Sequence, residues 1–355
     1  MKNLIRLVVL NFICLTLAFS SAVPVSVAEA QKITWNFHAA IGRGDIMLEE
    51  GWRWALNEIK KTTNGKFEGI VYEKSTLGFA GPDIPAAVGK GLLPFGELWG
   101  PHVVGRYPWI TALELPSLYD PTKIELWANL SDRLWDYYAK PLYKDNIILL
   151  ALVFPKGRSF AVNKPLNKDP KAILKGMKIR VSGPIPAWAC ETLGGVPVMM
   201  DFKEVYEAAQ RGMVDGVDPG LSDRNFLAMK FNEVVKIALL RDKENWTPFE
   251  LGNTTLMVIA NKDKFESLPS DLQSTIKSTF KVAGKRFLKP YRMDCKAAIM
   301  EGITQKGMQY ELIGSKTVEY LEQKAPEFWN SWKKKSGPYG VELLEKAIEI
   351  VKTYK

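Results

Sequence analysis

The architecture of this chain is read most directly from Leu174–Asp223, LKGMKIRVSGPIPAWACETLGGVPVMMDFKEVYEAAQRGMVDGVDPGLSD. Short apolar runs typical of strands cover residues 177–181, 196–200 and 213–217. Segments typical of helices lie between them: residues 186–193 end at two glycines, and residues 202–211 follow the capping-box spacing of Asp201 and Glu204. This alternation of strands and helices predicts a parallel sheet with right-handed crossovers.

Arg180 lies at the carboxyl end of the first of these strands, before the breaker cluster Ser182-Gly183-Pro184. Open α/β sheets place their ligands at that end of their strands. A guanidinium is planar and permanently charged, and it can donate two parallel hydrogen bonds to a carboxylate. The alternative is an arginine that pairs with a nearby acid, and the strand alone leaves both interpretations open.

Four motifs in this stretch resemble the solute-binding proteins of tripartite ATP-independent periplasmic (TRAP) transporters. They are K-G-x-K-I-R-V at Lys175–Val181, F-x-E-V-Y at Phe202–Tyr206, A-x-Q-x-G at Ala208–Gly212 and V-D-G at Val214–Gly216. They occur in the order and at the spacing of that family, and the resemblance covers essentially the whole mature chain. It implies an α/β fold of the two-lobed periplasmic-binding-protein type, with mostly parallel sheets flanked by helices and a long helix bridging both lobes.

The resemblance also implies a function. A small organic anion, a carboxylate, is captured between the lobes and delivered to the small and large membrane subunits of the transporter. In that family the arginine corresponding to Arg180 pairs with the carboxylate. Arg158 matches a G-x-R position that some members use as a second contact, with surface pairing as its alternative. The protein is expected to act as a monomer without a cofactor.

The same resemblance supplies further candidate site residues. The matches at Tyr107-Pro108 and Leu115-Pro116 place Trp99 and His102 where relatives line the pocket. The alternating residues 33–37 predict an opening strand, and Phe37 and His38 come from its corresponding end. The remaining members of the candidate set are Phe202, Asp218, Pro219 and Trp246. For the aromatic residues the alternative is packing in the core, and for a lone histidine it is a packed or surface position.

Asp218-Pro219-Gly220 departs from the family pattern, which often has an acid followed by Trp or Asn. Proline offers neither an indole surface nor an amide side chain, so this wall of the pocket must work differently. The ligand of close relatives therefore does not transfer to this chain. A small monocarboxylate, aromatic or hydroxylated, is the interpretation we favour, although arginine also accepts a sulfonate.

Some relatives bind a carboxylate together with a metal cation near residues 244–250. Glu244 or Glu250 could supply a ligand, but lone acids are more often solvated, so no metal is predicted. Nucleic acid is not expected as a partner either. The basic residues are spread along the chain, and the predicted export opposes such a role.

The first thirty residues have the pattern of a secretory signal. Lys2 and Arg6 precede an apolar core at Leu7–Phe19, and Ala28-Glu29-Ala30 matches a cleavage site, which predicts a mature periplasmic protein that begins at Gln31. The alternative, an uncleaved anchor, is disfavoured because the apolar core is too short to span a bilayer comfortably. Cleavage lowers the formal net charge from +9 to +8. Such a charge either favours anionic partners or has no specific role.

A mature chain of this length favours two domains. We predict residues 31–155 with 246–285 as lobe I, and residues 156–245 with 286–355 as lobe II. A helix is expected at 121–138 with a core stripe of Trp127, Leu130, Leu134 and Trp135, and another from Asp271 towards Tyr291 that bridges the lobes. Cys190 and Cys295 could form a disulfide, but two buried thiols are the favoured interpretation.

Two other functions remain open from the residues. A periplasmic enzyme is disfavoured because His38 and His102 are the only histidines and the sequence has no H-E-x-x-H, G-x-S-x-G, phosphate-loop or C-x-x-C motif. A ligand-sensing lobe for a membrane receptor would have the same sequence features as a transport receptor.

Overall fold

The structure is a computed structural model that describes residues 32–354, apart from residues 43, 74–75, 121–122, 201–203 and 222–223 and the side chains of residues 155–156. The expected signal segment, the expected helix cap at Asp201 and the candidate site residue Phe202 therefore lie outside the described residues. Among the described residues, no helix combines the length and apolar character needed to cross a bilayer.

The first sheet has five strands in the order β2-β1-β3-β11-β4. Their bounds are β1 (Ile33–His38), β2 (Phe67–Tyr72), β3 (Phe95–Trp99), β4 (Ile147–Gly157) and β11 (Asn253–Asn261). β1 is parallel to β2 and β3, whereas β11 is antiparallel to β3 and β4. The near-continuous apolar sequence of β4 arises because side chains on both of its faces are buried.

The second sheet has seven strands in the order β10-β9-β5-β8-β6-β7, with β12 also paired to β9. Their bounds are β5 (Ala161–Val162), β6 (Lys178–Val181), β7 (Val196–Met199), β8 (Gly216–Val217), β9 (Ile237–Asp242), β10 (Thr247–Pro248) and β12 (Gln309–Leu312). β6 is parallel to both β7 and β8, which confirms the parallel pairing predicted for this stretch.

Beyond that stretch the sheets are mixed, with more antiparallel pairing than the sequence predicts. β4 carries the chain out of the first sheet, and β11 brings it back beside β4 in the opposite direction. The crossing is fastened by backbone hydrogen bonds from Arg158 N to Gly252 O (2.9 Å) and from Leu251 N to Arg158 O (2.7 Å). A segment that leaves and one that returns must run antiparallel when they pair side by side.

The helices cover both sheets. In the first half of the chain they are η1 (Met47–Arg53, a π-helix), α1 (Trp54–Thr62), η2 (Gly81–Asp83), α2 (Ile84–Gly89), η3 (Gly100–His102), η4 (Pro108–Glu114), α3 (Ile124–Arg133) and α4 (Trp135–Lys144). In the second half they are α5 (Pro184–Thr192), α6 (Val205–Gln210), α7 (Arg224–Ala228), α8 (Phe231–Val234), α9 (Lys262–Glu266), α10 (Ser270–Arg286), α11 (Leu288–Thr304) and α12 (Ser315–Thr353).

The helix expected from Asp271 extends further than predicted, as α10 followed by α11. Tyr291 and Cys295 of α11 pack in the core of the first sheet, whereas Ile299 packs in a core of the second sheet. This confirms a long helical segment that bridges the two sheets. The single helix expected at 121–138 is instead two helices, because the backbone of Leu134 leaves the helical conformation between α3 and α4.

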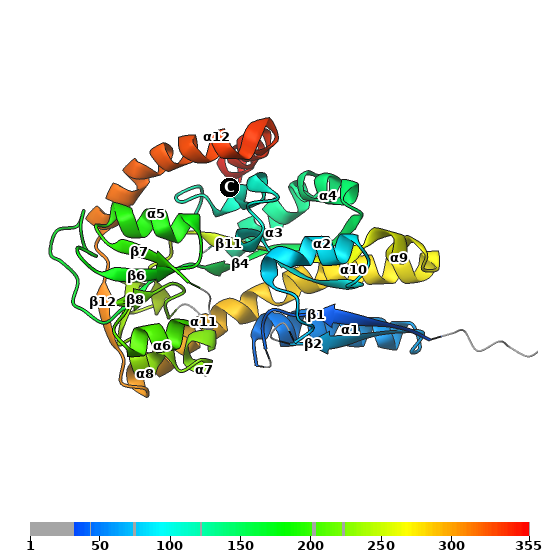
Figure 1. Ribbon diagram of the computed structural model, residues 1–355, viewed down its shortest axis with the longest axis horizontal. Helices are drawn as coiled ribbons and strands as arrows, with labels where there is room; N and C mark the ends of the chain where they lie inside the picture. Colours follow the sequence, from blue (N-terminus) through cyan, green and yellow to red (C-terminus); the bar gives the residue numbers. More distant parts are fainter. Residues whose placement is uncertain are drawn as a thin grey trace, which may run out of the picture. The chain divides into compact units, whose positions relative to one another are not determined.

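Residues 286–355, which the sequence assigns to lobe II, divide their contacts between the cores. On α12, Leu321 packs with the second sheet, whereas Leu343 and Ile350 pack with the first. α12 runs past α5 towards α3 and η4, in orange to red in Figure 1. Its path breaks at Gly337, whose φ of 70° is unfavourable for other residues.

Cys190 and Cys295 are buried in different hydrophobic clusters. Cys190 packs on α5 with the second sheet, and Cys295 packs on α11 with the first. The interpretation of two buried thiols is confirmed.

Candidate ligand-binding site

Arg158 and Arg180 converge on Asp218. β6 and β8 pair in parallel with Arg180 opposite Val217, so Asp218 comes to lie beside the end of β6. Nη1 of Arg180 donates to the carbonyl oxygen of Asp218, and Nη1 of Arg158 donates to its Oδ2 atom (3.4 Å). Arg180, Arg158 and Asp218 are only 4%, 7% and 0% exposed.

Ser182 and Glu114 complete this cluster. The Ser182 backbone N–H donates to Oδ2 of Asp218 (3.1 Å), and its hydroxyl links Asp218 with Nη1 of Arg158. Oε2 of Glu114 lies 3.9 Å from Nη2 of Arg158. We call these five residues (Glu114, Arg158, Arg180, Ser182 and Asp218) the arginine junction. They come from η4, from the crossing after β4 and from the ends of β6 and β8.

Glu114 changes the charge of the junction near neutral pH. Burial raises the pKa of its carboxyl to about 7, although Arg158 and the Thr255 N–H (2.9 Å) favour the charged form. A substantial fraction of Glu114 is therefore protonated near pH 7. The Arg158 guanidinium then faces the Asp218 carboxylate and a partly neutral Glu114, while the Arg180 guanidinium lies against the backbone carbonyl of Asp218.

Several buried polar atoms at the junction have no hydrogen-bond partner among the described residues. They are Nε of Arg158, Oδ1 of Asp218, Oγ of Ser159 and Oδ1 of Asn253. Gly157 pairs with Asn253 across β4 and β11, which places Asn253 next to the crossing. Buried polar groups are costly when unpaired, so such a concentration indicates a place where further hydrogen bonds can form.

The Asp218-Pro219-Gly220 turn fits tightly against the crossing. The Asp218-Pro219 peptide bond is cis, and Pro219 is half-buried. Gly220 N donates to Ser159 O (2.7 Å), and a Cβ atom at Gly220 would lie 2.4 Å from the carbonyl carbon of Phe160. At the residues that depart from the family pattern, the backbone of Gly220 therefore lies close to that of Phe160, beside both arginines.

A second polar group lies at the ends of β1 and β3. Glu97 accepts hydrogen bonds from Ala40 N (2.7 Å), Trp52 Nε1 (2.7 Å) and Trp99 Nε1 (3.5 Å). Burial raises the pKa of Glu97 to about 7, and the nearby Asp45 carboxylate also raises it. His38 is buried, and its burial lowers the pKa of the imidazole, which favours the neutral form.

The segment η3 connects the two polar groups. A Cβ atom at Gly100 would lie 2.8 Å from Oε1 of Glu114, and one at Gly183 would lie 3.7 Å from Cβ of Pro101. Trp99, which precedes this segment, is therefore close to the junction as well as to Glu97. This arrangement puts Trp99 and His38 on the side of the first sheet, with Arg180 and Pro219 on the side of the second.

The structure places other predicted site residues elsewhere. Phe37 is fully buried in the core and packs edge-on against Phe95, with ring centroids 5.0 Å apart. His102 is exposed, and its ring lies against Gly81. Trp246 lies in the turn between β9 and β10, where Nζ of Lys243 is 3.2 Å from its ring centroid. These contacts do not bring any of the three to the arginine junction.

The two acids considered as metal ligands have different surroundings. Glu250 forms a buried ion pair with Arg292, whose Nη2 lies 3.2 Å from Oε2, whereas Glu244 is exposed. Within the described ranges, no group of three or more His, Cys, Asp or Glu side chains is arranged to hold a metal ion.

Sequence reasoning missed Glu97, Glu114 and Ser182. Each acid interrupts an apolar run, Leu92–Trp99 for Glu97 and Trp109–Leu115 for Glu114, and a lone acid in a buried segment is a usable signal. Ser182 could be found from its position two residues after Arg180 at the end of the same strand. The partners of these residues could not be found in this way, because they are distant in the sequence.

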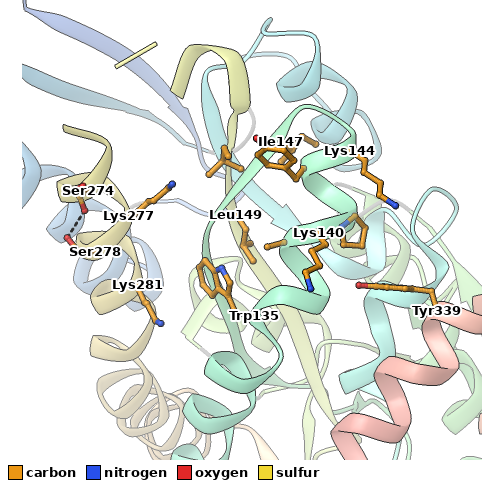
Figure 2. A pocket seen from close by; sticks show the side chains of 14 residues that line it. Trp135, Lys140, Lys144, Ile147, Leu149, Ser274, Lys277, Ser278, Lys281 and Tyr339 are labelled. Atoms are coloured by element: carbon orange, nitrogen blue, oxygen red, sulfur yellow. Dashed lines mark hydrogen bonds between the residues drawn. The ribbon is translucent and has the colours of Figure 1, made fainter. Parts of the chain in front are cut away.

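A groove with a volume of about 870 Å³ lies away from these residues, between α4, β4 and α10 (Figure 2). None of the predicted site residues lines it. We therefore assign the candidate site from the chemistry of the arginine junction and treat the groove separately below.

Residues 49–335 match the family described as bacterial extracellular solute-binding protein, family 7. The chain belongs to this family. This match, together with the likeness to a curated periplasmic binding protein described below, confirms the resemblance predicted from the motifs. Members of family 7 are extracytoplasmic solute-binding proteins, which agrees with a receptor and gives no support to the enzyme alternative.

Two curated relatives and one solved structure illustrate the likeness. An uncharacterized protein of Haemophilus influenzae is 28% identical over 228 residues, which are 64% of this chain and 66% of the relative. The 2,3-diketo-L-gulonate-binding periplasmic protein of Escherichia coli is 25% identical over 252 residues, 71% of this chain and 73% of the relative. The alignments thus span about two thirds to three quarters of these relatives.

The solved structure is a TRAP solute-binding protein from Rhodoferax ferrireducens in complex with copurified benzoate. It aligns with a TM-score of 0.77 and 20% identity, and the alignment covers 90% of this chain and 98% of that one. At this identity the likeness shows the two-lobed fold.

Proposed function

We propose that this family 7 protein binds a small organic carboxylate between its two lobes and delivers it to the small and large membrane subunits of a TRAP transporter. The observation that carries this proposal is the convergence of two buried guanidinium groups, those of Arg158 and Arg180, on Asp218. Buried cations are costly unless they are paired, and a carboxylate ligand is a matching partner.

The two arginines have different roles in this proposal. Arg158 is oriented by Asp218, Ser182 and Glu114, so its position is fixed before a ligand arrives. Arg180 donates from Nε and Nη2 to the carbonyl oxygen of Met200 (3.3 and 3.2 Å), which fixes the plane of its guanidinium at the ends of β6 and β7. Arg180 forms the primary contact with the carboxylate, and Arg158 adds a second.

The wall opposite the arginines comes from Trp99, held by Glu97, and from His38, while Pro219 lines the site beside Asp218. An indole and a proline ring are apolar surfaces that suit the body of a small monocarboxylate, aromatic or hydroxylated. The benzoate of the Rhodoferax structure and the sugar acid named for the Escherichia coli relative are consistent with this class.

Export by a signal cleaved after Ala30 places the chain in the periplasm, where it acts as a monomer that binds its ligand without chemical turnover. Lobe I comprises residues 31–155 and 246–285, and lobe II comprises residues 156–245 together with the part of 286–355 that packs on the second sheet, as Ile299 and Leu321 do. The lobes close on the ligand by a hinge motion, with the crossing strands as the hinge.

A thermal-shift screen of the mature chain tests the ligand class. The panel contains aliphatic, hydroxy, keto, dicarboxylic and aromatic acids together with small sulfonates. Ligand at about a hundred times its dissociation constant adds roughly 2.7 kcal/mol to stability, which is a readily measured shift. We expect a shift confined to one group of carboxylates. Stabilisation by neutral solutes alone would contradict the proposal.

Arg180→Ala tests the clamp with whichever ligand the screen identifies. Truncating one partner of a buried charge pair costs roughly 2–5 kcal/mol, which turns a micromolar ligand into one that binds near the millimolar range or weaker. Arg211→Ala is a matched control, because Arg211 is 70% exposed and pairs on the surface with Glu207, its one acidic partner among the described residues. Binding of Arg180→Ala within a few-fold of the unmodified protein would rule out the assigned role.

A further inference from the structure

The groove between α4, β4 and α10 has a composition unlike that of the binding site. Its fourteen lining residues include four lysines (Lys140, Lys144, Lys277 and Lys281) and no acid, above an apolar floor that includes Trp135, Ile147 and Leu149 (Figure 2). We call it the lysine groove. Its volume of about 870 Å³ is within the range of ~300–1,000 Å³ found for ligand cavities.

The lysine groove faces the edge of the first sheet. Consecutive strand residues point to opposite faces, yet Ile147, Ile148 and Leu149 all line the groove. Ile147 and Leu149 pack in the cluster that contains Leu142 of α4, whereas Ile148 packs in the cluster that contains Ile276 of α10. The two helices thus cover opposite faces of β4, and the groove between them runs along the strand itself.

β4 is the terminal strand of this sheet, with β11 as its only neighbour among the described strands. In an antiparallel pair, alternate residues direct their N–H and C=O groups to the neighbour, and the intervening ones direct theirs outward. An edge strand therefore presents a row of hydrogen-bonding groups that another strand can pair with. The groove reaches this edge at Ile147–Leu149, of which Ile148 is the most accessible at 8% exposed.

The charge of the groove selects the kind of strand that fits. Lys140, Lys144 and Lys277 are exposed and form no ion pair with any described residue, whereas Lys281 lies 3.5 Å from Asp132. A second copy of this chain paired edge to edge would set lysines against lysines. An acidic segment instead supplies opposite charge on both sides of the strand.

We propose that the lysine groove is a docking site for an extended, acidic segment of a partner protein, which pairs with β4 as a sixth strand. Main-chain hydrogen bonds to the β4 edge hold the segment, and its alternate side chains lie against Trp135 and the apolar floor. Its carboxylates lie between the lysines of α4 and those of α10. This site is distinct from the arginine junction and does not depend on the function proposed there.

Fluorescence polarisation with a labelled peptide of about eight residues that alternates Glu and Val tests the proposal with the mature full chain. We expect saturable binding that weakens at high salt, because exposed charges are screened. The triple variant Lys140→Glu, Lys144→Glu and Lys277→Glu should weaken binding by about tenfold or more. A peptide that alternates Lys and Val should not bind.

Two controls make the test specific. Charge reversal at three other exposed lysines, Lys316, Lys334 and Lys335, changes the net charge equally and should leave most of the binding intact. N-methylation of alternate peptide residues blocks one edge of the bound strand, so one methylation register should abolish binding while the other is tolerated. Far-UV circular dichroism and thermal melting check that each variant is folded.

Four results would overturn the proposal. The peptide could fail to bind at millimolar concentration, or both methylation registers could bind equally, which would exclude strand pairing. The distant lysine variants could weaken binding as much as the groove variants, which would indicate nonspecific attraction. Dimerisation of the protein that is abolished by the groove variants would identify a second copy as the occupant instead.

Discussion

The arginine junction and the lysine groove both concentrate positive charge, but they do so in opposite ways. The junction buries two planar guanidinium groups and orients them with Asp218, Ser182 and backbone carbonyl oxygens. The groove displays flexible ammonium groups at the surface, and three of its four lysines form no ion pair with a described acid. The first arrangement is fixed before binding, whereas the second is adaptable.

This difference determines what each region can recognise and what it contributes to stability. Preorganised donors in a buried site favour one small planar anion and lose much when a single partner is removed. Exposed lysines attract acidic groups over a broader surface and are screened by salt. The comparison predicts large effects of substitution at the junction and small ones at the groove.

Asp218→Asn should have the largest effect on stability. It keeps the shape of the side chain but removes the charge that faces Arg158, and breaking a buried ion pair costs roughly 3–5 kcal/mol. Urea unfolding at neutral pH measures this loss. Glu207→Gln removes an exposed acid, 69% accessible and paired with Arg211, and should leave the unfolding midpoint almost unchanged. Equal unfolding midpoints of the two variants would show that the junction is not a buried ion-pair cluster.

Gly220→Ala should have the next largest effect. The added Cβ atom would meet the backbone of Phe160 and Ala161 at 2.4–2.7 Å, and backbone cannot move aside as a side chain tip can. Overpacking of this kind costs roughly 1–3 kcal/mol or more, and it should also displace the adjacent Asp218. Gly105→Ala is the control, because no atom lies within 4 Å of its added Cβ. Urea unfolding and ligand affinity are the two measurements.

The sequence predicts some of this junction and not the rest. Arg180 lies at the end of one strand and Asp218 follows another, and the parallel arrangement of these strands was predicted from local pattern. Their order in the sheet, β8-β6-β7, which brings the two residues together, was not predicted. Glu114 approaches Arg158 only because β4 and β11 pair and bring η4 against the crossing, and nothing local encodes that contact. Phe37 illustrates a different limit. Its position at a strand end was predicted, but local pattern did not predict that its ring lies on the face of the sheet that packs in the core.

The groove was harder to foresee. Trp135 belongs to an apolar stripe that predicts a core residue, yet it is half-buried and lines the groove. The near-continuous apolar sequence of β4 is typical of a strand covered on both faces, and both of its faces are buried. The same pattern cannot tell an edge strand from a central one, because a strand's neighbours are set by long-range pairing and not by its own side chains.

The dependence of stability on pH is expected to arise from the buried acids of the site and not from the exposed lysines of the groove. The pKa values of Glu97 and Glu114 are about 7 in the folded state, above the ordinary value of 4.5. Between these values the folded state holds more protons than the unfolded state, so stability should fall as pH rises through that window and level off above it. Each carboxyl contributes at most about 3 kcal/mol to this fall.

Urea unfolding near pH 5 and near pH 8 checks this expectation, in the unmodified protein and in Glu97→Gln and Glu114→Gln. Each variant should reduce the difference in the free energy of unfolding between pH 5 and pH 8, even if loss of hydrogen bonds lowers stability at both pH values. Glu68→Gln is the control, because hydrogen bonds from Lys32 and Lys60 lower the pKa of Glu68 to about 2, outside this window. An unchanged slope in both site variants would contradict the assignment of raised pKa values.

The smallest effect on stability is expected from the groove. Lys140→Glu and Lys144→Glu replace exposed side chains without an acidic partner, and such surface substitutions change stability by no more than about 0.5 kcal/mol. The same pair should nevertheless weaken binding of the acidic peptide, so binding and stability separate at the groove and change together at the junction. A stability loss comparable to that of Asp218→Asn would mean that the lysine stems are part of the packing of α4. The groove would then belong to the architecture of the first sheet and not to its surface for partners.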